Sequence, residues 1–191
     1  MTAISPLQSI HKKGLFGDHQ KKNNNEILTI SELKNLSIIQ IVKYKNSKSI
    51  LESIDGLEPS LQNLKVSANE DTRVLWNAPN TWLIVSKKEN IIKEINEKFS
   101  NESFAVTDIS HSRAIIQIKG PCAKEVLKKG CPLNFNEFKE NDCAGSTFHG
   151  INFIVDCVDS KGAMFNLLTL RSFGESLYHH ITDASLEYGY S

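Results

Sequence analysis

Short runs of β-branched and aliphatic residues alternate along this chain with short segments whose apolar residues recur at helical spacing. From Ser37 onward the order reads strand, helix, strand, strand, helix, strand, and a similar order follows after Ile109. That succession is the ferredoxin-like βαββαβ arrangement. The pattern therefore predicts an α+β protein made of two ferredoxin-like βαββαβ halves in one compact unit.

The first half is expected over residues 31–109. Its predicted elements are a strand at IIQIVKY, a short helix at SKSILESIDG, a hairpin at RVLWNAPNTWLIVS, a helix at ENIIKEINEKF and a strand at SFAVTDI. Gly56 follows the first of these helices at a position that stops helices. Pro79 and the asparagines beside it are typical turn residues, so the hairpin is expected to reverse there.

The second half is expected over residues 110–191. Its predicted elements are a strand at RAIIQIKG, a helix at PCAKEVLKKG, two strands at INFIVDCV and AMFNLLTL, and a final helix at SFGESLYHHITDASLEYG. In the first strand, Ala114, Ile116 and Ile118 share one face. Ser172 and Glu175 have the spacing of a capping box at the start of the final helix.

Residues 1–30 are predicted to form an N-terminal arm. The stretch HKKGLFGDHQKKNNN (11–25) is polar, basic and rich in asparagine, with little apolar surface to bury. Two interpretations are open: a flexible tail, or an arm that orders against a partner and is anchored by residues 4–7, Leu15 and Phe16.

The charge balance argues against some classes of function. The 22 basic and 22 acidic residues cancel to a formal net charge of +0, so no global field attracts nucleic acid or an anionic membrane. No apolar stretch approaches the roughly 20 residues that span a bilayer, and the N-terminus lacks the pattern of a signal peptide. We therefore expect a cytoplasmic protein without nucleic-acid or membrane partners.

Cysteine spacing gives no sign of a metal or redox site. The four cysteines, at positions 122, 131, 143 and 157, form no C-x-x-C pair, and are expected to be reduced thiols. Cys122 has the best features of a nucleophile, because the first turn of a helix can stabilise a thiolate. Its nearest base, His111, stands at the other end of a predicted strand, roughly 20 Å away at about 3.3 Å per residue.

The other reactive-looking side chains also fail to form a catalytic set. Neighbouring polar residues from Asp108 to Arg113 predict a turn, since the members of a triad converge from distant positions. His179 and His180 are adjacent on a helix and cannot hold one metal together, and His149 with Gly150 predicts a turn. No phosphate loop or dinucleotide fingerprint occurs, so we predict no catalytic, cofactor-binding or metal-binding residue in this chain.

Four residues are instead candidates for a subunit interface: His111, Arg113, Arg171 and Phe173. The turn that carries the first two either closes on itself or meets a partner or a ligand cavity. Arg171, at the end of a predicted strand, pairs with a carboxylate of its own fold or of a neighbour. Trp76 and Trp82 are expected to be core or interface anchors.

Several motifs together resemble one known family. They are SPL (5–7), Pro79 and Trp82 of APNTWLIV, the stretch DISHSRAIIQIKGPCAKEVLKKGCPLNF (108–135) and the closing LRSFGESLYHHITDASLEYG. In these motifs the chain is similar to the gamma subunits of heterotetrameric sarcosine oxidases, which are related to the folate-binding part of the glycine-cleavage aminomethyltransferase (T-protein). The chain departs from the family at Asn80–Thr81, where an acidic residue often precedes the tryptophan, and in its Lys- and Asn-rich N-terminal region.

This resemblance implies a T-protein-like folate-binding-domain fold and a place in a multisubunit enzyme. Such enzymes oxidatively demethylate sarcosine to glycine, form hydrogen peroxide, and pass the one-carbon unit to tetrahydrofolate. FAD, FMN, NAD, tetrahydrofolate and zinc are expected in the other subunits and none in this chain. The alpha subunit is the expected main contact of this chain, with beta and delta subunits in the same complex. The alternative is a stand-alone folate-dependent aminomethyltransferase-like enzyme.

Overall fold

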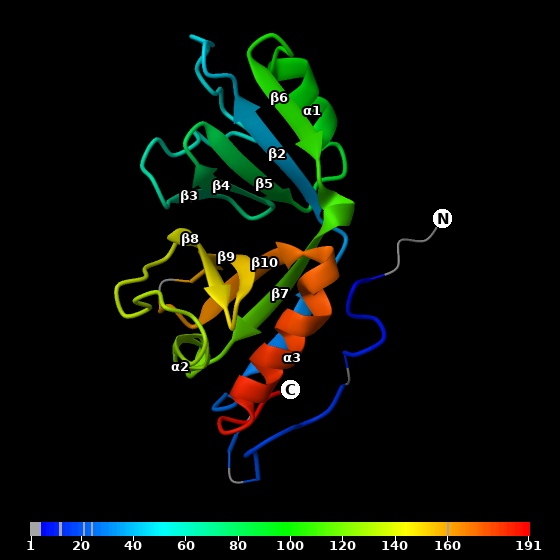
Figure 1. The fold of residues 1–191 in the computed structure, drawn as a ribbon, viewed down its shortest axis with the longest axis vertical. Coiled ribbons are helices and arrows are strands. Elements are labelled where there is room, and N and C mark those ends of the chain that lie inside the picture. The colour runs from blue at the N-terminus through cyan, green and yellow to red at the C-terminus, as the bar shows by residue number, and fades with distance from the viewer. Residues whose placement is uncertain (1–4, 12, 21, 24, 160) are drawn as a thin grey trace. The chain divides into compact units, whose positions relative to one another are not determined.

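The computed structural model describes residues 5–11, 13–20, 22–23, 25–159 and 161–191, which form two compact units (Figure 1). Unit 1 combines the described residues up to Lys34 with residues 112–140 and 145–191, and unit 2 combines residues 35–111 and 141–144. Each unit is organised around an antiparallel sheet of five strands. The predicted α+β class is confirmed. The chain passes between the units near residues 34, 111, 140 and 144, whereas the sequence analysis placed its boundaries after residues 30 and 109.

The sheet of unit 1 has the strand order β1-β7-β10-β9-β8. Its strands are β1 (Thr29–Leu33), β7 (Arg113–Lys119), β8 (Cys143–Phe148), β9 (Ile151–Cys157) and β10 (Met164–Leu170). Its helices are α2 (Ala123–Lys128) and α3 (Gly174–Ser185), with a 3₁₀ turn, η2 (Arg171–Phe173), directly before α3. The predicted strands at β7, β9 and β10 and the two predicted helices are confirmed.

The side chains of β7 alternate between the two faces of the sheet, and this explains which face α3 packs against. Ala114, Ile116 and Ile118 are buried on one face of the strand, as the sequence predicted. Gly174 begins α3 against this face, because a Cβ there would lie 3.0 Å from Cβ of Ala114. Figure 1 shows α3 lying along β7. By the two-residue period of a strand, Arg113 therefore belongs to the opposite face of the sheet.

The sheet of unit 2 has the strand order β3-β4-β5-β2-β6. Its strands are β2 (Ser37–Lys43), β3 (Val66–Ala68), β4 (Thr72–Ala78), β5 (Thr81–Ser86) and β6 (Phe104–Asp108), and its helix is α1 (Ile91–Lys98). Ile91 and Ile95 of α1 pack with Ile39, Ile84 and other buried residues of the sheet in one apolar core. The predicted hairpin is confirmed, with Asn80 left-handed at φ 58° in its turn.

The helix predicted at SKSILESIDG is wrong. Residues 48–56 are irregular, and Asp55 and Gly56 are both left-handed, with φ values of 52° and 74°. Ile54 and Leu57 exchange two backbone hydrogen bonds of 2.9 Å across them. An Asp–Gly pair with two positive φ angles favours a tight reversal of the chain, and this preference outweighs the helical spacing of the apolar residues.

Other differences concern helix capping and three strands. The predicted capping box does not form, because η2 precedes α3 and the helix makes no side-chain cap hydrogen bond. The sequence analysis missed β1, β3 and β8. β1 is held by a distant part of the chain, because it pairs with β7 in antiparallel register, with Ile30 opposite Ile118. β3 pairs with β4, and β8 is an edge strand beside β9.

The N-terminal region packs on unit 1 at several described points. Leu7 and Leu28 are fully buried. The rings of Phe16 and Tyr190 stack at a centroid distance of 5.2 Å, and their backbones exchange two hydrogen bonds. Leu15 is 51% exposed, and Ile4 lies outside the described residues. The role of this region as an arm toward a partner stays a prediction.

Candidate functional site

Cys122 stands at the N-cap of α2 and makes no side-chain cap hydrogen bond. All four cysteines are free thiols. The strand β7 lies between His111 and Cys122 in the chain and has seven residues, so its two ends are roughly 20 Å apart at about 3.3 Å per residue. Cys122 therefore lies at the start of a helix, beyond the end of β7 that is opposite Arg113.

The polar turn after β6 closes on itself. Oδ1 of Asp108 accepts hydrogen bonds from the Ser110 hydroxyl at 2.6 Å and from the Ser110 backbone N–H at 2.9 Å. Ser110 Oγ in turn accepts a hydrogen bond of 2.8 Å from the backbone N–H of Ile38. These bonds from Ser110 hold the pKa of Asp108 below its usual value of 3.8. The predicted turn is confirmed, and its hydroxyl serves to link two strands.

The histidines do not assemble a metal site. His149, at φ 47°, and Gly150 turn the chain between β8 and β9, as predicted. The rings of His149 and His180 are 5.2 Å apart, and His179 lies 3.8 Å from the exposed carboxylate of Glu175. Within the described ranges, no three His, Cys, Asp or Glu side chains group as metal ligands. No described helix is both long enough and apolar enough to cross a membrane.

Trp82 is a core anchor of unit 2, as predicted. It is 6% exposed and pairs with Trp76 across the β4–β5 hairpin. Its indole N–H is buried without a hydrogen-bond partner among the described residues. Trp82 belongs to the packed apolar core of unit 2.

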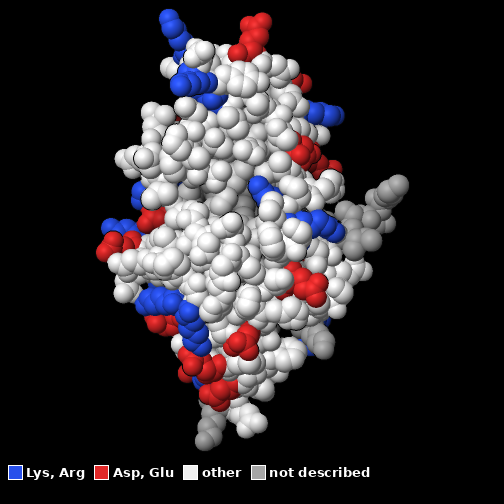
Figure 2. All heavy atoms as spheres, viewed as in Figure 1, with Lys and Arg blue, Asp and Glu red and all other residues white. Residues whose placement is uncertain are grey.

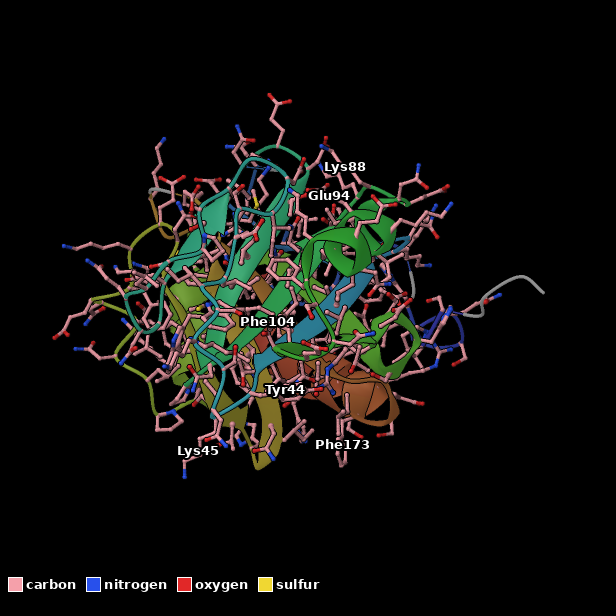
Figure 3. All side chains as sticks on the ribbon, turned by 90° about the horizontal axis from the view of Figure 1, so that it is seen from above. Tyr44, Lys45, Lys88, Glu94, Phe104 and Phe173 are labelled. Atoms are coloured by element: carbon pink, nitrogen blue, oxygen red, sulfur yellow. The ribbon has the colours of Figure 1, made fainter. Side chains whose placement is uncertain are left out.

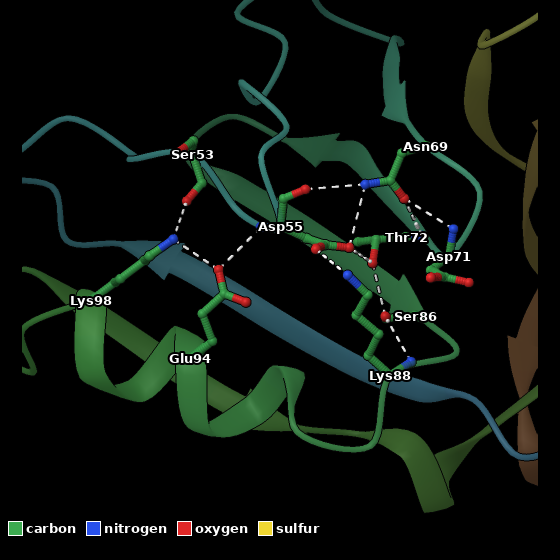
Figure 4. Close-up of polar contacts among 9 residues, drawn as sticks. All are labelled: Ser53, Asp55, Asn69, Asp71, Thr72, Ser86, Lys88, Glu94 and Lys98. Carbon is green, nitrogen blue, oxygen red and sulfur yellow. Dashed lines mark hydrogen bonds and ion pairs between the residues drawn. The ribbon is translucent and has the colours of Figure 1, made fainter.

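A dense polar cluster surrounds Asp55 in unit 2 (Figure 4). Its carboxylate pairs with Lys88 and accepts hydrogen bonds from the Thr72 hydroxyl at 2.7 Å and from the Asn69 amide at 3.3 Å. The bond from Lys88 lowers the pKa of Asp55 most, burial opposes this, and Thr72 and Asn69 lower it further. The carboxylates of Asp55 and Glu94 are both ion-paired and hydrogen-bonded. The cluster therefore ties the irregular segment to the sheet.

The helix α1 joins the same cluster. Glu94 accepts a hydrogen bond of 3.1 Å from the backbone N–H of Asp55 and one of 2.8 Å from Lys98. Lys98 also donates to the backbone carbonyl of Ser53 at 3.1 Å. Sequence analysis missed this cluster because its members come from separate elements. The Asp–Gly turn signal at Asp55 could have located its centre.

An open groove of about 490 Å³ lies at one end of the unit 1 sheet. It is formed where β7 begins, β10 ends and β9 begins, with β8 at the edge of the sheet. Its lining residues are Arg113, Gly145, Ser146, Thr147, Asn152, Phe153, Ile154, Leu168, Thr169 and Leu170. The groove is mostly apolar, with hydroxyl and amide groups on the β8 and β9 side.

Arg113 is the charged residue of this groove. It pairs in register with Leu170 and is partly buried. Burial lowers the pKa of its guanidinium. None of the described residues accepts a hydrogen bond from it or forms an ion pair with it, whereas Arg73, for example, donates to Asn141 at 3.1 Å. A partly desolvated guanidinium without a counter-charge is suited to bind a carboxylate or another oxyanion.

The predicted interface residues fall into two groups. Arg113, Arg171 and Phe173 are brought together at one end of the unit 1 sheet, because η2 directly follows the strand that pairs with β7. His111 belongs to unit 2 and lies exposed on the 3₁₀ turn η1 (Ser110–Ser112). Phe173 is 45% exposed and lies at the edge of the view in Figure 3.

The described part of the face in Figure 2 carries no concentration of charge of one sign. On the described part of the face in Figure 2, Lys and Arg side chains are interspersed with Asp and Glu, and broad areas carry neither. This distribution agrees with the formal net charge of +0. A basic tract of the kind that follows a nucleic-acid backbone does not occur on this face.

Comparison with known proteins gives a consistent result. The model of the sarcosine oxidase gamma subunit family matches residues 49–187. Sarcosine oxidase subunit gamma of Corynebacterium sp. (strain U-96) is 27% identical over 120 residues, which cover 61% of this chain and 58% of that relative. The same subunit of Corynebacterium sp. (strain P-1) is 24% identical over 143 residues, covering 73% and 70%. The chain thus spans less than two thirds of the length of the first relative.

Two solved structures have similar folds. A chain of the heterotetrameric sarcosine oxidase from Corynebacterium sp. U-96 in complex with pyrrole 2-carboxylate matches with a TM-score of 0.76 at 21% identity, over 87% of both chains. Glycine cleavage system aminomethyltransferase T from Bartonella henselae matches with a TM-score of 0.59 at 11% identity, over 82% of this chain and 46% of that chain. The predicted T-protein-like fold is confirmed.

Proposed function

This chain belongs to the sarcosine oxidase gamma subunit family, and on that basis we propose that it is a non-catalytic subunit of a multisubunit, flavin-dependent oxidase. The family match over residues 49–187 carries the proposal. The local geometry supports it, because the hydroxyl, carboxylate and ammonium groups around Asp55 and Ser110 are engaged in holding the fold. The contribution of this chain is then a surface that completes the complex.

The reaction of the complex is proposed by family analogy. It is the oxidative demethylation of sarcosine to glycine, with hydrogen peroxide as a product and capture of the one-carbon unit by tetrahydrofolate. The flavins, NAD, zinc and the folate site belong in this proposal to the other subunits. The side chains of this chain hold no cofactor and take part in no chemical step.

The main partner in this proposal is the alpha subunit. Permanent subunit interfaces commonly bury more than about 2,000 Å² and are rich in apolar residues. Leu170 and Phe173, which are 43% and 45% exposed, supply such surface next to Arg113 and Arg171. We propose that this end of unit 1 contacts the alpha subunit, and that His111 on unit 2 is a further candidate contact residue.

Co-expression tests the proposal. This chain, carrying an affinity tag, is produced alone and together with the other three subunits. Alone, it is expected to aggregate or to unfold readily, because its interface is exposed. Together, it is expected to co-purify with the flavoprotein subunits in an assembly that forms hydrogen peroxide from sarcosine. A stable monomer that never co-purifies with them would contradict the proposal.

The fold shared with aminomethyltransferase T favours one alternative function, a stand-alone folate-dependent one-carbon enzyme. Isothermal titration of the purified chain with tetrahydrofolate separates the two functions. The assembly proposal predicts no measurable heat of binding. Tight binding in the absence of other subunits would favour the enzyme instead.

A further inference from the structure

The positive charge of Arg113 needs a counter-charge or a hydrogen-bond acceptor, and the described residues supply neither. Its guanidinium is partly buried in the groove of unit 1, yet none of these residues bonds to it. Removing a charge from water without a compensating partner is unfavourable. The other two arginines differ in this respect, because Arg73 bonds to Asn141 and Arg171 also has an interaction partner. The partly buried position of Arg113 becomes favourable when an anion from outside the described residues pairs with its guanidinium.

The groups around Arg113 define which anion fits. Leu168 and Leu170 place apolar surface beside the guanidinium, while the Asn152 side chain and the Thr147 hydroxyl line the same groove. Neither of these polar side chains is hydrogen-bonded within the described ranges. A single positive charge with apolar walls matches a carboxylate on an apolar stem better than it matches a phosphate, which usually recruits several cations or a nest of N–H groups.

The apolar surface continues beyond the groove. Leu170, at the end of β10, is 43% exposed, and Phe173 follows it on η2 with 45% exposure. The groove itself is open to solvent on one side, so it does not enclose a small molecule. An occupant that covers both the groove and these two side chains has to be larger than an amino acid. A segment of a protein partner meets this requirement.

We propose that the groove is a docking site for a carboxylate-bearing, apolar segment of a partner subunit, in which an Asp, Glu or terminal carboxylate pairs with Arg113 while neighbouring apolar residues cover Leu170 and Phe173. This inference rests on the proposed function, because it assumes that the chain is assembled with other subunits. It adds the chemistry of the partner surface. The planar guanidinium favours a bidentate pair, which fixes orientation as well as affinity.

The test compares two charge-removing variants of the same strand in the co-expressed complex. Arg113→Gln removes the proposed pair, and Lys119→Gln removes one positive charge from the exposed opposite end of β7. Dissociation of this chain from the complex is measured by analytical ultracentrifugation over a dilution series. Breaking a partly buried interfacial charge pair is expected to raise the dissociation constant by about 10- to 100-fold, whereas Lys119→Gln changes it less than about 3-fold.

Salt dependence and a second substitution cover the case in which Arg113→Gln folds poorly. Dissociation of the wild-type complex is expected to rise more steeply with ionic strength than that of the variant. Arg113→Lys keeps the charge and the aliphatic stem but loses the planar fork, so it is expected to weaken binding by about 3- to 10-fold. An Arg113→Lys complex with unchanged affinity and unchanged salt dependence would overturn the proposed pair.

The remaining outcomes are also decisive. If the wild-type complex forms and Arg113→Gln behaves like Lys119→Gln, the docking site is refuted while the proposed function stands. If the wild-type chain does not assemble with the other subunits, both the docking site and the proposed function are refuted. If sodium acetate raises the Tm of the wild-type complex but not that of an equally stable Arg113→Gln complex, the groove binds free carboxylates, and a protein occupant is refuted.

Discussion

Asp55 offers the sharpest test of how the irregular segment before β3 is held. Its carboxylate joins Lys88, Thr72 and Asn69, and its own backbone is left-handed at φ 52°. Two substitutions separate these effects. Asp55→Asn removes the charge and keeps a residue that tolerates the left-handed region, whereas Asp55→Ala removes every side-chain contact and strains the backbone.

The expected loss of stability in each variant follows from the burial of each partner of Asp55. Thr72 is fully buried, so its hydrogen bond to the carboxylate is worth about 1.5 kcal/mol, and that of the exposed Asn69 about 0.5 kcal/mol. The side chain of Lys88 is 45% exposed, so its pair with Asp55 is screened by solvent and is left out of the sum. Asp55→Ala should cost about 3 kcal/mol, including roughly 1 kcal/mol of backbone strain. Asp55→Asn should cost about 1 kcal/mol, because the charge is lost but one acceptor remains.

Hydrogen exchange followed by mass spectrometry of the assembled complex measures this cost locally. In peptides covering residues 50–58, about 3 kcal/mol corresponds to exchange that is more than 100-fold faster, and about 1 kcal/mol to roughly fivefold. Glu125→Gln is the control, because its carboxylate is 52% exposed and pairs with Lys128 one turn away. It should change exchange in its own helix by less than about twofold. Unchanged exchange at residues 50–58 in Asp55→Ala would show that the cluster does not hold this segment.

The same cluster has a defined dependence on pH. The pKa of Asp55 in the folded chain lies below its ordinary value of 3.8. A lowered carboxyl pKa stabilises the folded state above the unfolded value, and this contribution is lost as pH falls through the folded value. The difference in local opening free energy between wild type and Asp55→Asn should therefore be constant above about pH 5 and shrink below 3.8. A difference that grew on acidification would contradict this sign.

Three further predictions concern the thiols and the N-terminal region. Cys122→Ser should leave sarcosine turnover of the proposed complex within about threefold of wild type, because the thiol makes no cap hydrogen bond and contributes little. A loss of orders of magnitude with assembly intact would mean that the thiol takes part in the reaction. Burial raises the pKa of Cys157 to about 11, so iodoacetamide at neutral pH should modify the partly exposed Cys122 first and Cys157 only after denaturation, as read by peptide mass spectrometry. Gly17→Ala should expose residues 13–20 to proteolysis. The φ angle of Gly17 is 70°, and a Cβ there would lie 2.1 Å from the carbonyl oxygen of Leu186. A digestion rate equal to that of wild type would refute this contact.

The elements that sequence reasoning located best are those whose stability is local. The runs at β7, β9 and β10 alternate or are continuously apolar, and the hairpin at Pro79 has its own turn chemistry. By contrast, β1 has the sequence TISEL and β8 has CAGSTF, and neither is rich enough in apolar residues to predict a strand. Both form because a neighbouring strand supplies their hydrogen bonds: β1 pairs with the distant β7, which a short window of sequence cannot show, and β8 lies at the sheet edge beside β9.

The candidate site illustrates the same limit. Sequence analysis selected Arg113 as an interface residue from its place beside a polar turn. Its groove, however, is built from β8, β9 and β10, which follow Arg113 by more than twenty residues. Whether a charged side chain has a partner depends on the folded arrangement, so the unpaired guanidinium became visible only in the structure. Asp55 was missed for the same reason, because Thr72 and Lys88 reach it from β4 and from the residues after β5.

Unit 1 is discontinuous in the chain, and this has a consequence for biosynthesis. Tyr190 and Ser191 hydrogen-bond with Phe16, Leu28 and Ile30, so these early segments find their partners only after Tyr190 and Ser191 are made. All residues of unit 2 precede residue 145, so they leave the ribosome before the end of unit 1. A nascent polypeptide arrested before α3 would thus contain all of unit 2 but only part of unit 1. Such an intermediate exposes apolar surface and is the kind that chaperones recognise.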